Sequence, residues 1–537
     1  MPTLHWVGKD KVKHHHRDVP YRVLVDDHRY QAPAGSPDNS SANRIIQGDN
    51  LEALKSLLPE FEAKVQCIYI DPPYNTGNES WVYNDNVNDP RIKKWLGQVV
   101  GKEGEDMSRH DKWLCMMYPR LKLLHRLLAH DGVLLVSIDD NEVQHLRPLM
   151  DELFGSKNRI EQFIWKKSYG GGAKERYAVT VHEYVLMYAK NIDAISELSL
   201  PPDPSAESRY YKLTDEKLNT RGPFRIKPLE ATKSMDRRDN LNYPIEAPDG
   251  SMILPKRQWW WAKERVEQAI KNNELYFGRG KSGDWSISYK QYLRDDQGIE
   301  RQSKPFSIID GIYTQTGSTV LREIFDSQIF QFPKPPSLIS LFLSMLNLPK
   351  DAIILDSFAG SGTTAHAVLK LNAQDGGNRR FILIEMMDYA NSLTAERARR
   401  VMAGYGTGDK AVAGLGGGFV YQQLGAPLFD GEQQLNPAVA VQAVRAYIAW
   451  QECIPRDALA AVDNARHPYW LGEANGQQVF FCYEPQRITC LDLELLAELI
   501  QSPAPTLFYA DQLALGEDFM RTHKLRFKKI PRDISRL

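Results

Sequence analysis

Four consecutive residues, Asp71, Pro72, Pro73 and Tyr74, directly follow the apolar run Cys67–Ile70, which is typical of a buried β-strand. Proline has no backbone N–H, so the strand must end there and the loop beyond it is stiff. The Asp71 carboxylate and the Pro72 carbonyl are then two acceptors that can bind both N–H groups of an exocyclic amine. Such binding draws the nitrogen toward sp³ geometry and localises its lone pair for in-line attack. The alternative is a rigid turn that Asp71 caps.

Tyr74 adds an aromatic face on which a base can stack, and a base inside duplex DNA must be flipped out before it can reach such a loop. Methylation at C5 of cytosine needs a cysteine nucleophile instead. The dipeptide Pro-Cys does not occur in this sequence, and Cys67 falls in the middle of the predicted strand, so that chemistry is not expected.

A second motif, Asp356–Thr364, has the letters DSFAGSGTT and follows another apolar run. A strand that ends in a glycine turn before a helix directs backbone N–H groups at a ligand. Phe358 is expected to pack against that ligand, and Thr363 suits the N-cap of the helix. The loop lacks the lysine of a phosphate-binding loop and the last glycine of a dinucleotide fingerprint. Glu385 ends the next strand, where a carboxylate can hold a ribose.

These features suit a nucleoside without a pyrophosphate, and S-adenosylmethionine is such a ligand. The alternative for the glycine motif by itself is an ordinary tight turn between a strand and a helix. No set of metal-ligating residues is predicted, because none of the five cysteines forms a Cys-x-x-Cys pair. The odd number of cysteines is typical of reduced thiols in a cytoplasmic protein.

Two regions of alternating strands and helices would position these motifs. Near-continuous apolar strands between helices indicate a parallel sheet that is covered on both faces. Each region by itself is too small to close a core, so we expect them to form one doubly wound sheet. The first region has strands at Arg44–Gln47, Val65–Ile70 and Val133–Ile138 and helices at Asn50–Leu58, Lys112–Leu128 and Asn141–Phe154; the second has strands at Ala352–Leu355 and Arg380–Ile384 and helices at Thr363–Leu371 and Thr394–Met402.

The remaining segments are assigned by composition. The middle, Ser156–Phe332, is less periodic and rich in aromatic and basic residues, and it holds a strand at His182–Lys190. Seven glycines in Gly404–Gly418 predict a flexible connection. The predicted division is an N-terminal arm (1–43), a first sheet half (44–155), an insertion (156–332), a second sheet half (333–403), a glycine-rich linker (404–418) and a small α/β domain (419–537). Three adjacent histidines, His14–His16, are a set that could bind a metal, but the preferred expectation places them on a solvated arm.

The net charge of −1 does not exclude nucleic acid, because binding depends on local fields. Between Gly155 and Pro305 there are 27 Lys and Arg against 21 Asp and Glu. This surplus is typical of a solvated face and gains meaning only beside a motif that needs DNA. Trp260 is as compatible with a core as with a DNA contact. The residues predicted to bind DNA are Lys166, Lys167, Lys174, Arg225, Arg237 and Arg238.

The Asp-Pro-Pro-Tyr and Phe-Ala-Gly-Ser-Gly motifs together resemble those of DNA amino-methyltransferases. Their order, with the Asp-Pro-Pro-Tyr motif first, is similar to that of the β class of N6-adenine and N4-cytosine enzymes. Supporting segments resemble the modification (Mod) subunits of type III restriction–modification systems. The resemblance implies a permuted, Rossmann-like methyltransferase sheet, an inserted target-recognition domain and a small C-terminal α/β domain.

By this resemblance, Asp71, Pro72, Pro73 and Tyr74 form the catalytic loop. The implied S-adenosylmethionine residues are Asp49, Lys334, Asp356, Phe358, Gly360, Gly362, Thr363 and Glu385, with Asp49 near the adenine and Glu385 on the ribose, tasks that these two acids could exchange. The implied partners are double-stranded DNA, a second copy of the chain and a restriction (Res) subunit; a solitary or phage-encoded enzyme is the alternative. No signal peptide or membrane span is expected, so a cytoplasmic location is predicted.

The leading hypothesis is therefore an N6-adenine DNA methyltransferase of a restriction–modification or host-defence system. An N4-cytosine enzyme is the second hypothesis, since both amines present the same pair of N–H bonds. Asp71 favours adenine, because N4 enzymes of the class more often carry serine there. A catalytically silent DNA-binding subunit is a third hypothesis, against which the intact motif argues. The missing phosphate-binding lysine argues against a phosphotransferase.

Overall fold

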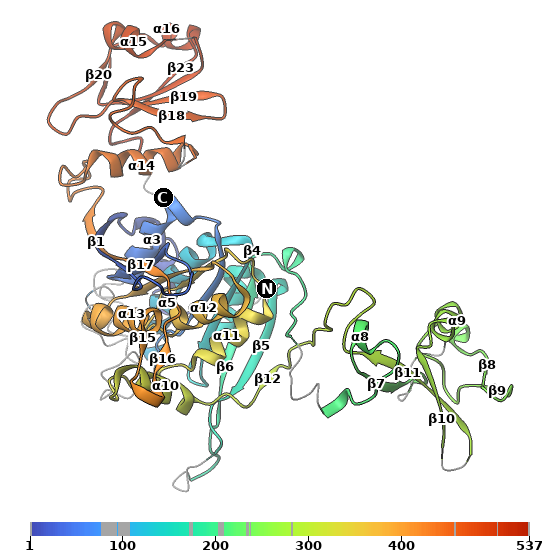
Figure 1. Ribbon diagram of the computed structural model, residues 1–537. Coiled ribbons are helices and arrows are strands. Elements are labelled where there is room, and N and C mark those ends of the chain that lie inside the picture. Colours follow the sequence, from blue (N-terminus) through green and yellow to red (C-terminus); the bar gives the residue numbers. More distant parts are fainter. Residues whose placement is uncertain are drawn as a thin grey trace. The chain divides into compact units, whose positions relative to one another are not determined.

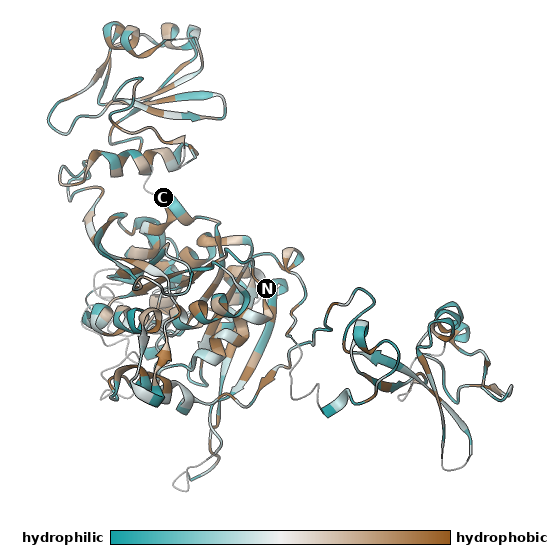
Figure 2. Ribbon diagram, in the orientation of Figure 1, coloured by the Kyte–Doolittle hydropathy of each residue, from teal (hydrophilic) through white to brown (hydrophobic). Residues whose placement is uncertain are grey.

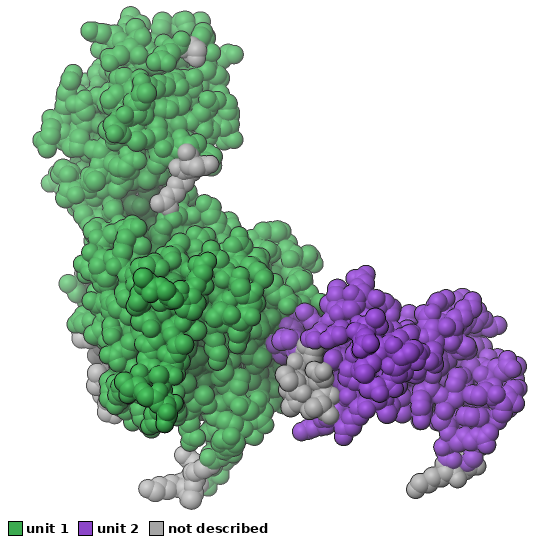
Figure 3. All heavy atoms as spheres, viewed as in Figure 1, with its two compact units in different colours: residues 1–197, 306–537 green, residues 198–305 purple. Residues whose placement is uncertain are grey.

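The computed structural model describes residues 3–76, 94, 108–170, 176–201, 209–231, 236, 238–280, 283–455, 458–501 and 503–534. The chain divides into two compact units (Figure 3). Unit 1 comprises residues 1–197 and 306–537, and unit 2 comprises residues 198–305. Among the described residues, none of the helices combines the length and apolar character needed to cross a membrane.

A ten-stranded sheet is the centre of unit 1 (Figure 1). The strands, in order across the sheet, are β1 (Arg22–Gln31), β17 (Gly418–Pro427), β2 (Asn43–Gln47), β14 (Arg380–Glu385), β13 (Ile353–Asp356), β3 (Val65–Ile70), β4 (Leu128–Ile138), β6 (His182–Ala189), β5 (Arg159–Lys166) and β12 (Ile308–Ile309). The six strands from β17 to β4 in this order run parallel to their neighbours. At the two ends of the sheet, β1 is antiparallel to β17, β6 is antiparallel to both β4 and β5, and β12 is parallel to β5.

The central strands interleave the two sequence regions, since β13 lies between β14 on one side and β3 on the other. All four residues of β13 are buried, as are all but the first of β14, which is the pattern of strands covered on both faces. The expectation of one α/β sheet built from both regions is confirmed. The side chains that follow β13 and β3 therefore share one edge, where open α/β sheets bind their ligands.

The helices of unit 1 begin and end at recognisable signals. The Asp49 carboxylate accepts from the backbone N–H groups of Leu51 and Glu52 and caps α3. A capping box formed by Ser108 and Asp111 begins α5. Helices α3 and α5 bury their apolar sides in one core with strands β3 and β4. The bounds are α3 Asn50–Phe61, α5 Arg109–Leu127, α6 Val143–Met150, α10 Thr314–Phe325, α11 Pro336–Met345, α12 Thr363–Asp375 and α13 Glu396–Ala403.

The predicted insertion, 156–332, was too wide. Strands β5, β6 and β12 belong to the large sheet, and residues 198–305 form the separate unit. Strand β5 was not predicted because buried and exposed residues are mixed along it, as expected near the edge of a sheet, so its sequence lacks an apolar run. Unit 2 has a three-stranded antiparallel sheet, β10 (Leu275–Arg279), β11 (Trp285–Tyr292) and β7 (Phe224–Pro228), beside α9 (Lys263–Lys271). Its ribbon mixes hydrophilic and hydrophobic stretches (Figure 2).

The predicted N-terminal arm is instead ordered structure. Strand β1 pairs with β17, and the short helices α1 (Lys9–Val12) and α2 (His15–Asp18) contact α5. His16 is buried, and burial, with help from Lys122, lowers its pKa to about 4, so the expectation of solvated histidines was wrong for this residue. Four-residue helices are too short to leave a periodic signal in the sequence.

The glycine-rich segment 404–418 is also ordered, with a short hairpin of β15 (Gly404–Tyr405) and β16 (Val412–Ala413). A Cβ atom on Gly416 would lie 1.8 Å from the carbonyl oxygen of Pro37, so glycine there permits close packing. Strand β17 then completes the large sheet. The C-terminal α/β domain thus begins after β17, with α14 (Val441–Gln451) and the four strands β18 (Trp470–Ala474), β19 (Gln477–Phe481), β21 (Thr506–Ala510) and β23 (Leu525–Lys529).

Candidate active site

The Asp-Pro-Pro-Tyr loop leaves β3 at its carboxyl end and is held from behind by α5. The indole N–H of Trp113 donates to the Pro73 carbonyl at 2.6 Å in a buried contact. Asn75, the next residue after Tyr74, adopts a left-handed conformation with φ +58°. Its side-chain amide donates to the Arg109 carbonyl at 3.2 Å and also to the Glu142 carboxylate. These contacts fix the loop at Pro73 and Asn75 and leave the Asp71 side chain facing a cavity.

Lys334 lies at the centre of the charged groups in this cavity. Its ammonium group donates to both oxygens of Asp71, at 2.9 and 2.8 Å, and to the Tyr74 hydroxyl at 2.8 Å. It also lies 3.5 Å from the Glu183 carboxylate, which accepts from the Tyr74 hydroxyl at 3.1 Å. Lys167 donates to the other Glu183 oxygen at 2.9 Å. Two carboxylates and two ammonium groups therefore balance one another around Tyr74.

The pKa values of these groups follow from burial and pairing. Burial raises the pKa of Asp71, and the Lys334 ammonium opposes that rise. Burial also acts to raise the pKa of Glu183, but Lys334 and Lys167 outweigh it and lower the pKa. Burial acts to lower the pKa of Lys334, yet the Asp71 and Glu183 carboxylates raise it above its ordinary value. Lys334 thus remains charged and favours the ionised form of Asp71.

The glycine loop, residues 357–363, follows β13 and is shaped by two glycines with positive φ, +50° at Gly360 and +77° at Gly362. A Cβ atom on Gly362 would lie 2.9 Å from the Thr394 carbonyl oxygen, so only glycine fits. Gly362 is the N-cap residue of α12. The prediction that Thr363 is the N-cap was therefore wrong; its hydroxyl accepts from the buried Arg397 guanidinium at 2.7 Å.

Two buried carboxylates hold the glycine loop. Asp356 accepts from the Phe358 backbone N–H at 3.0 Å and from the Thr364 hydroxyl at 2.5 Å. Glu385 accepts from the Gly360 backbone N–H at 2.7 Å. Burial raises the pKa of each carboxyl group to about 7.

One cavity of about 430 Å³ joins the two loops, which is large enough for a nucleoside-sized ligand. Asp71 at the end of β3 and Gly360 after β13 both line it. The other predicted residues in its lining are Pro72, Tyr74, Lys167, Lys334, Asp356, Phe358 and Thr363. The lining also contains six residues that were not predicted as site residues from the sequence: Tyr69, Asp139, Trp165, Glu183, Phe330 and Phe332.

The cavity suits S-adenosylmethionine by its chemistry. Acidic side chains such as Asp356 favour a sulfonium cation, the backbone of the glycine loop offers polar groups, and Phe358, Phe330 and Ile339 give apolar surface for a nucleoside. Lys334, the lysine expected beside the cofactor, lines this cavity and contacts Asp71 and Tyr74, so its contact with the cofactor stays a prediction. Glu183 carried one signal in the sequence, since it is the acidic residue inside the apolar strand β6.

Several predicted cofactor residues lie outside the cavity lining. The Asp49 carboxylate caps α3 and lies 3.4 Å from the Arg120 guanidinium. Gly362 shapes the glycine loop, and the Glu385 carboxylate supports that loop by accepting from the Gly360 backbone N–H. Pro73 also lies outside the lining and is held by Trp113. Each of these residues thus has a structural task, and ligand contact by Asp49 and Glu385 stays a prediction.

The residues predicted to bind DNA are spread over both units. In unit 1, Lys166 pairs with Asp310 at 3.1 Å and Lys167 lines the cavity. In unit 2, Arg225 donates to Gln291 at 2.8 Å, and Arg238 is exposed. Lys174 and Arg237 lie outside the described residues. The neighbouring tryptophans divide: Trp259 is buried, whereas Trp260 is 47% exposed, so the core alternative for Trp260 was wrong.

The fold and this cavity define the class of a Rossmann-like methyltransferase in which the Asp-Pro-Pro-Tyr loop precedes the glycine loop. The N6_N4_Mtase family model, described as DNA methylase, matches residues 65–396. The chain is 31% identical over 422 residues to the type III restriction-modification enzyme StyLTI Mod subunit of Salmonella typhimurium, covering 76% of this chain and 61% of that subunit. It is 32% identical over 372 residues to the type II methyltransferase M.KpnI of Klebsiella pneumoniae, covering 65% of this chain and 82% of that enzyme.

The chain belongs to the N6_N4_Mtase family of DNA methylases. It spans 61% of the length of the StyLTI Mod subunit and 64% of the EcoPI Mod subunit of Escherichia phage P1, to which it is 32% identical. Among solved structures, the PvuII DNA methyltransferase (cytosine-N4-specific) matches with a TM-score of 0.33 and 12% identity over 68% of this chain and 89% of that one. The family assignment rests on the sequence comparisons.

Proposed function

We propose that this chain transfers a methyl group from S-adenosylmethionine to N6 of adenine in double-stranded DNA, after base flipping. The observation that carries the proposal is that Asp71 and Gly360 line the same cavity although 289 positions separate them in the sequence. Family membership supports the reaction class. When bound, S-adenosylmethionine supplies an electrophilic methyl group.

In the proposed reaction, the Asp71 carboxylate and the Pro72 carbonyl accept the two N–H groups of the flipped adenine. The nitrogen lone pair then points toward the glycine loop for in-line attack. Because Lys334 favours the ionised form of Asp71, this carboxylate stays a strong acceptor and can take the proton that the nitrogen releases. The Tyr74 hydroxyl bonds to Glu183 and Lys334, which fixes its ring as a stacking platform.

Unit 2 is the proposed target-recognition domain. Between residues 198 and 305 the chain has 20 Lys and Arg against 16 Asp and Glu, and Arg225 and Arg238 lie within it. Basic side chains on such a unit would neutralise phosphates and read base edges. By similarity to Mod subunits, the proposed setting is a restriction–modification system in the cytoplasm, with a dimer of this chain and a Res subunit as partners.

Long-read sequencing of DNA from cells that express the protein tests the proposal, because it reports the modified base and its sequence context together. The expected result is N6-methyladenine at one recurring motif. N4-methylcytosine at a recurring motif would instead show that the methylated base is cytosine and that the chain is an N4-cytosine methyltransferase. Unmodified DNA, together with purified protein that does not bind S-adenosylmethionine in calorimetry, would instead indicate a silent DNA-binding subunit.

A further inference from the structure

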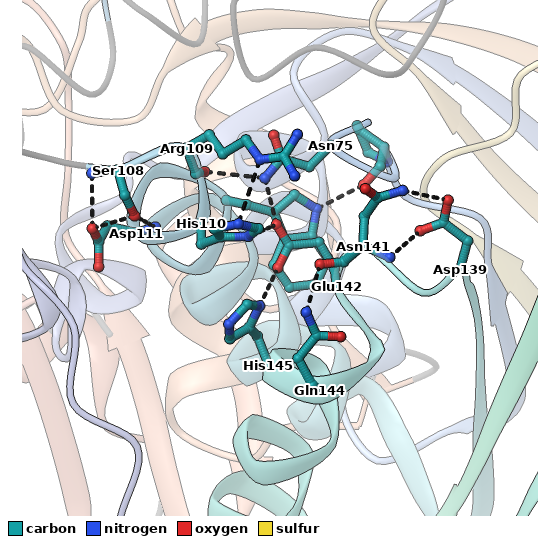
Figure 4. A network of polar contacts seen from close by, with 12 residues as sticks. Asn75, Ser108, Arg109, His110, Asp111, Asp139, Asn141, Glu142, Gln144 and His145 are labelled. Atoms are coloured by element: carbon teal, nitrogen blue, oxygen red, sulfur yellow. Dashed lines mark hydrogen bonds and ion pairs between the residues drawn. The ribbon is translucent and has the colours of Figure 1, made fainter. Parts of the chain in front are cut away.

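A cluster of His110, Glu142 and His145 lies at the corner between α5 and α6 (Figure 4). Each imidazole offers its Nδ1 atom to a different oxygen of the Glu142 carboxylate, both at 2.8 Å. The Glu142 side chain is fully buried, whereas the His110 and His145 side chains are 31% and 27% exposed. The cluster therefore has a buried carboxyl group at its base and two partly exposed imidazoles beside it.

The residue types and spacing match a transition-metal site. One ligand atom from each of the three residues lies within 4.8 Å of the other two. Zinc binds histidine nitrogen and carboxylate oxygen at about 2.0–2.2 Å, so ligand atoms around one ion are separated by roughly 3–4 Å. The ligand atoms would therefore have to approach one another by less than about 2 Å to surround one ion. Two neutral nitrogens and one carboxylate form a ligand set found in zinc sites that keep an open position.

The surroundings of Glu142 hold it in a ligating orientation. The Asn75 side-chain amide donates to Glu142, and its other described acceptor is the Arg109 carbonyl. Such contacts from a neighbouring residue orient a metal ligand, and their loss typically weakens metal binding by about 10–100-fold. The Nε atom of the exposed Arg109 guanidinium donates to Nε2 of His110 at 3.4 Å, so this contact must be given up if His110 turns toward an ion.

We propose that His110, Glu142 and His145 bind one divalent transition-metal ion of the zinc type. The ion would join the first turn of α5 to the start of α6, and Asn75 would connect that corner to the Asp-Pro-Pro-Tyr loop. No cysteine belongs to this cluster, so the lack of Cys-x-x-Cys pairs in the sequence does not argue against it. A role of the ion in holding the loop rests on the proposed function; binding of the ion does not.

The test uses the full, untagged chain after removal of metal by a chelator. Zinc chloride is titrated in by calorimetry, and cobalt is added separately to record its visible absorption, which reports low-coordinate nitrogen and oxygen ligation. His110→Ala and His145→Ala should each weaken zinc binding by at least about 100-fold, since each removes a ligand. Asn75→Gly, which tolerates the positive φ, should weaken it by about 10–100-fold through loss of the outer contact.

Two controls isolate the site. His130→Ala removes another exposed histidine, which contacts Asn191 away from the cluster, and should leave zinc affinity unchanged. A His14→Ala, His15→Ala double variant removes two N-terminal histidines that could compete as ligands, and it should also leave zinc affinity unchanged. Retained zinc binding in both ligand variants, or no zinc binding by the wild-type chain, would overturn the proposal. S-adenosylmethionine affinity, measured on the same samples, checks folding and reports on the proposed function separately.

Discussion

Replacing Lys334 by methionine tests how the Asp71 carboxylate is kept ionised. The substitution keeps the approximate volume of the side chain and removes an ammonium group that bonds to both Asp71 oxygens. Two unit charges about 4 Å apart interact by about 4 kcal/mol at an effective dielectric constant of about 20. The Asp71 side chain is 27% exposed, so solvent screening reduces this to roughly 2 kcal/mol, or about 1.5 pKa units.

The sign of the effect is fixed by the charge that is lost. Without Lys334, the pKa of Asp71 rises further, so a larger share of the protein carries a protonated, weak acceptor at neutral pH. In Lys334→Met we therefore expect the acid limb of the kcat/KM profile to move up by about 1.5 pH units. The rate at acidic pH should fall by up to about 30-fold and recover as the pH rises.

The assay follows transfer of a labelled methyl group to duplex DNA between pH 5.5 and pH 9. The matched variant is Lys167→Met, because the Lys167 ammonium pairs with Glu183, whereas the Lys334 ammonium bonds to Asp71 itself. It should leave the acid limb of kcat/KM within about half a pH unit of the wild type. A Lys334→Met profile that superimposes on the wild type after scaling would refute the reasoning that Lys334 sets the charge of Asp71.

Three further results are expected. Trp113→Phe leaves the buried Pro73 carbonyl without its donor, so it should lower the urea unfolding free energy by about 1–3 kcal/mol and reduce kcat with little change in cofactor affinity. The Glu385 carboxyl has a pKa of about 7 and accepts from both ribose hydroxyls only when it is ionised, so the Kd for S-adenosylmethionine in calorimetry should fall about tenfold between pH 6 and pH 8. Glu385→Gln should reduce that dependence and leave the part due to Asp356, whose pKa is also about 7, whereas a flat wild-type profile would argue against ribose contact. Gly362→Ala adds a Cβ against a carbonyl and should abolish cofactor binding, whereas Gly376→Ala, with the same sign of φ and open space, should cost only about 1 kcal/mol in thermal unfolding.

The sequence predicted the parts of the fold whose signals are local and strong. Strand β3 has the predicted bounds, and β13, β14 and α12 agree within a few residues, because long apolar runs and a glycine turn mark them. The pairing of β1 with β17 could not be predicted, since almost 400 residues separate them, and β1 is a half-exposed edge strand without a clear apolar run.

The candidate site shows the same division. Asp71 and Gly360 were found because their motifs are compact in the sequence. Glu183 was missed because its partners, Lys334 and Lys167, come from other elements, and only the folded sheet brings them together. For the same reason, the contacts of Lys334 with the Asp-Pro-Pro-Tyr loop could not be predicted from the sequence. Charge networks of this kind depend on tertiary distances that no spacing rule contains.

The most direct test of the central claim compares the wild type with Asp71→Asn in one reaction. Duplex DNA is incubated with S-adenosylmethionine that carries a deuterated methyl group, digested to nucleosides and analysed by mass spectrometry, with cofactor affinity measured on the same protein. The account predicts deuterated N6-methyl-2′-deoxyadenosine from the wild type, and a rate at least about 100-fold lower from Asp71→Asn, with the cofactor affinity retained within about threefold. Equal methyl transfer by the two proteins would contradict it.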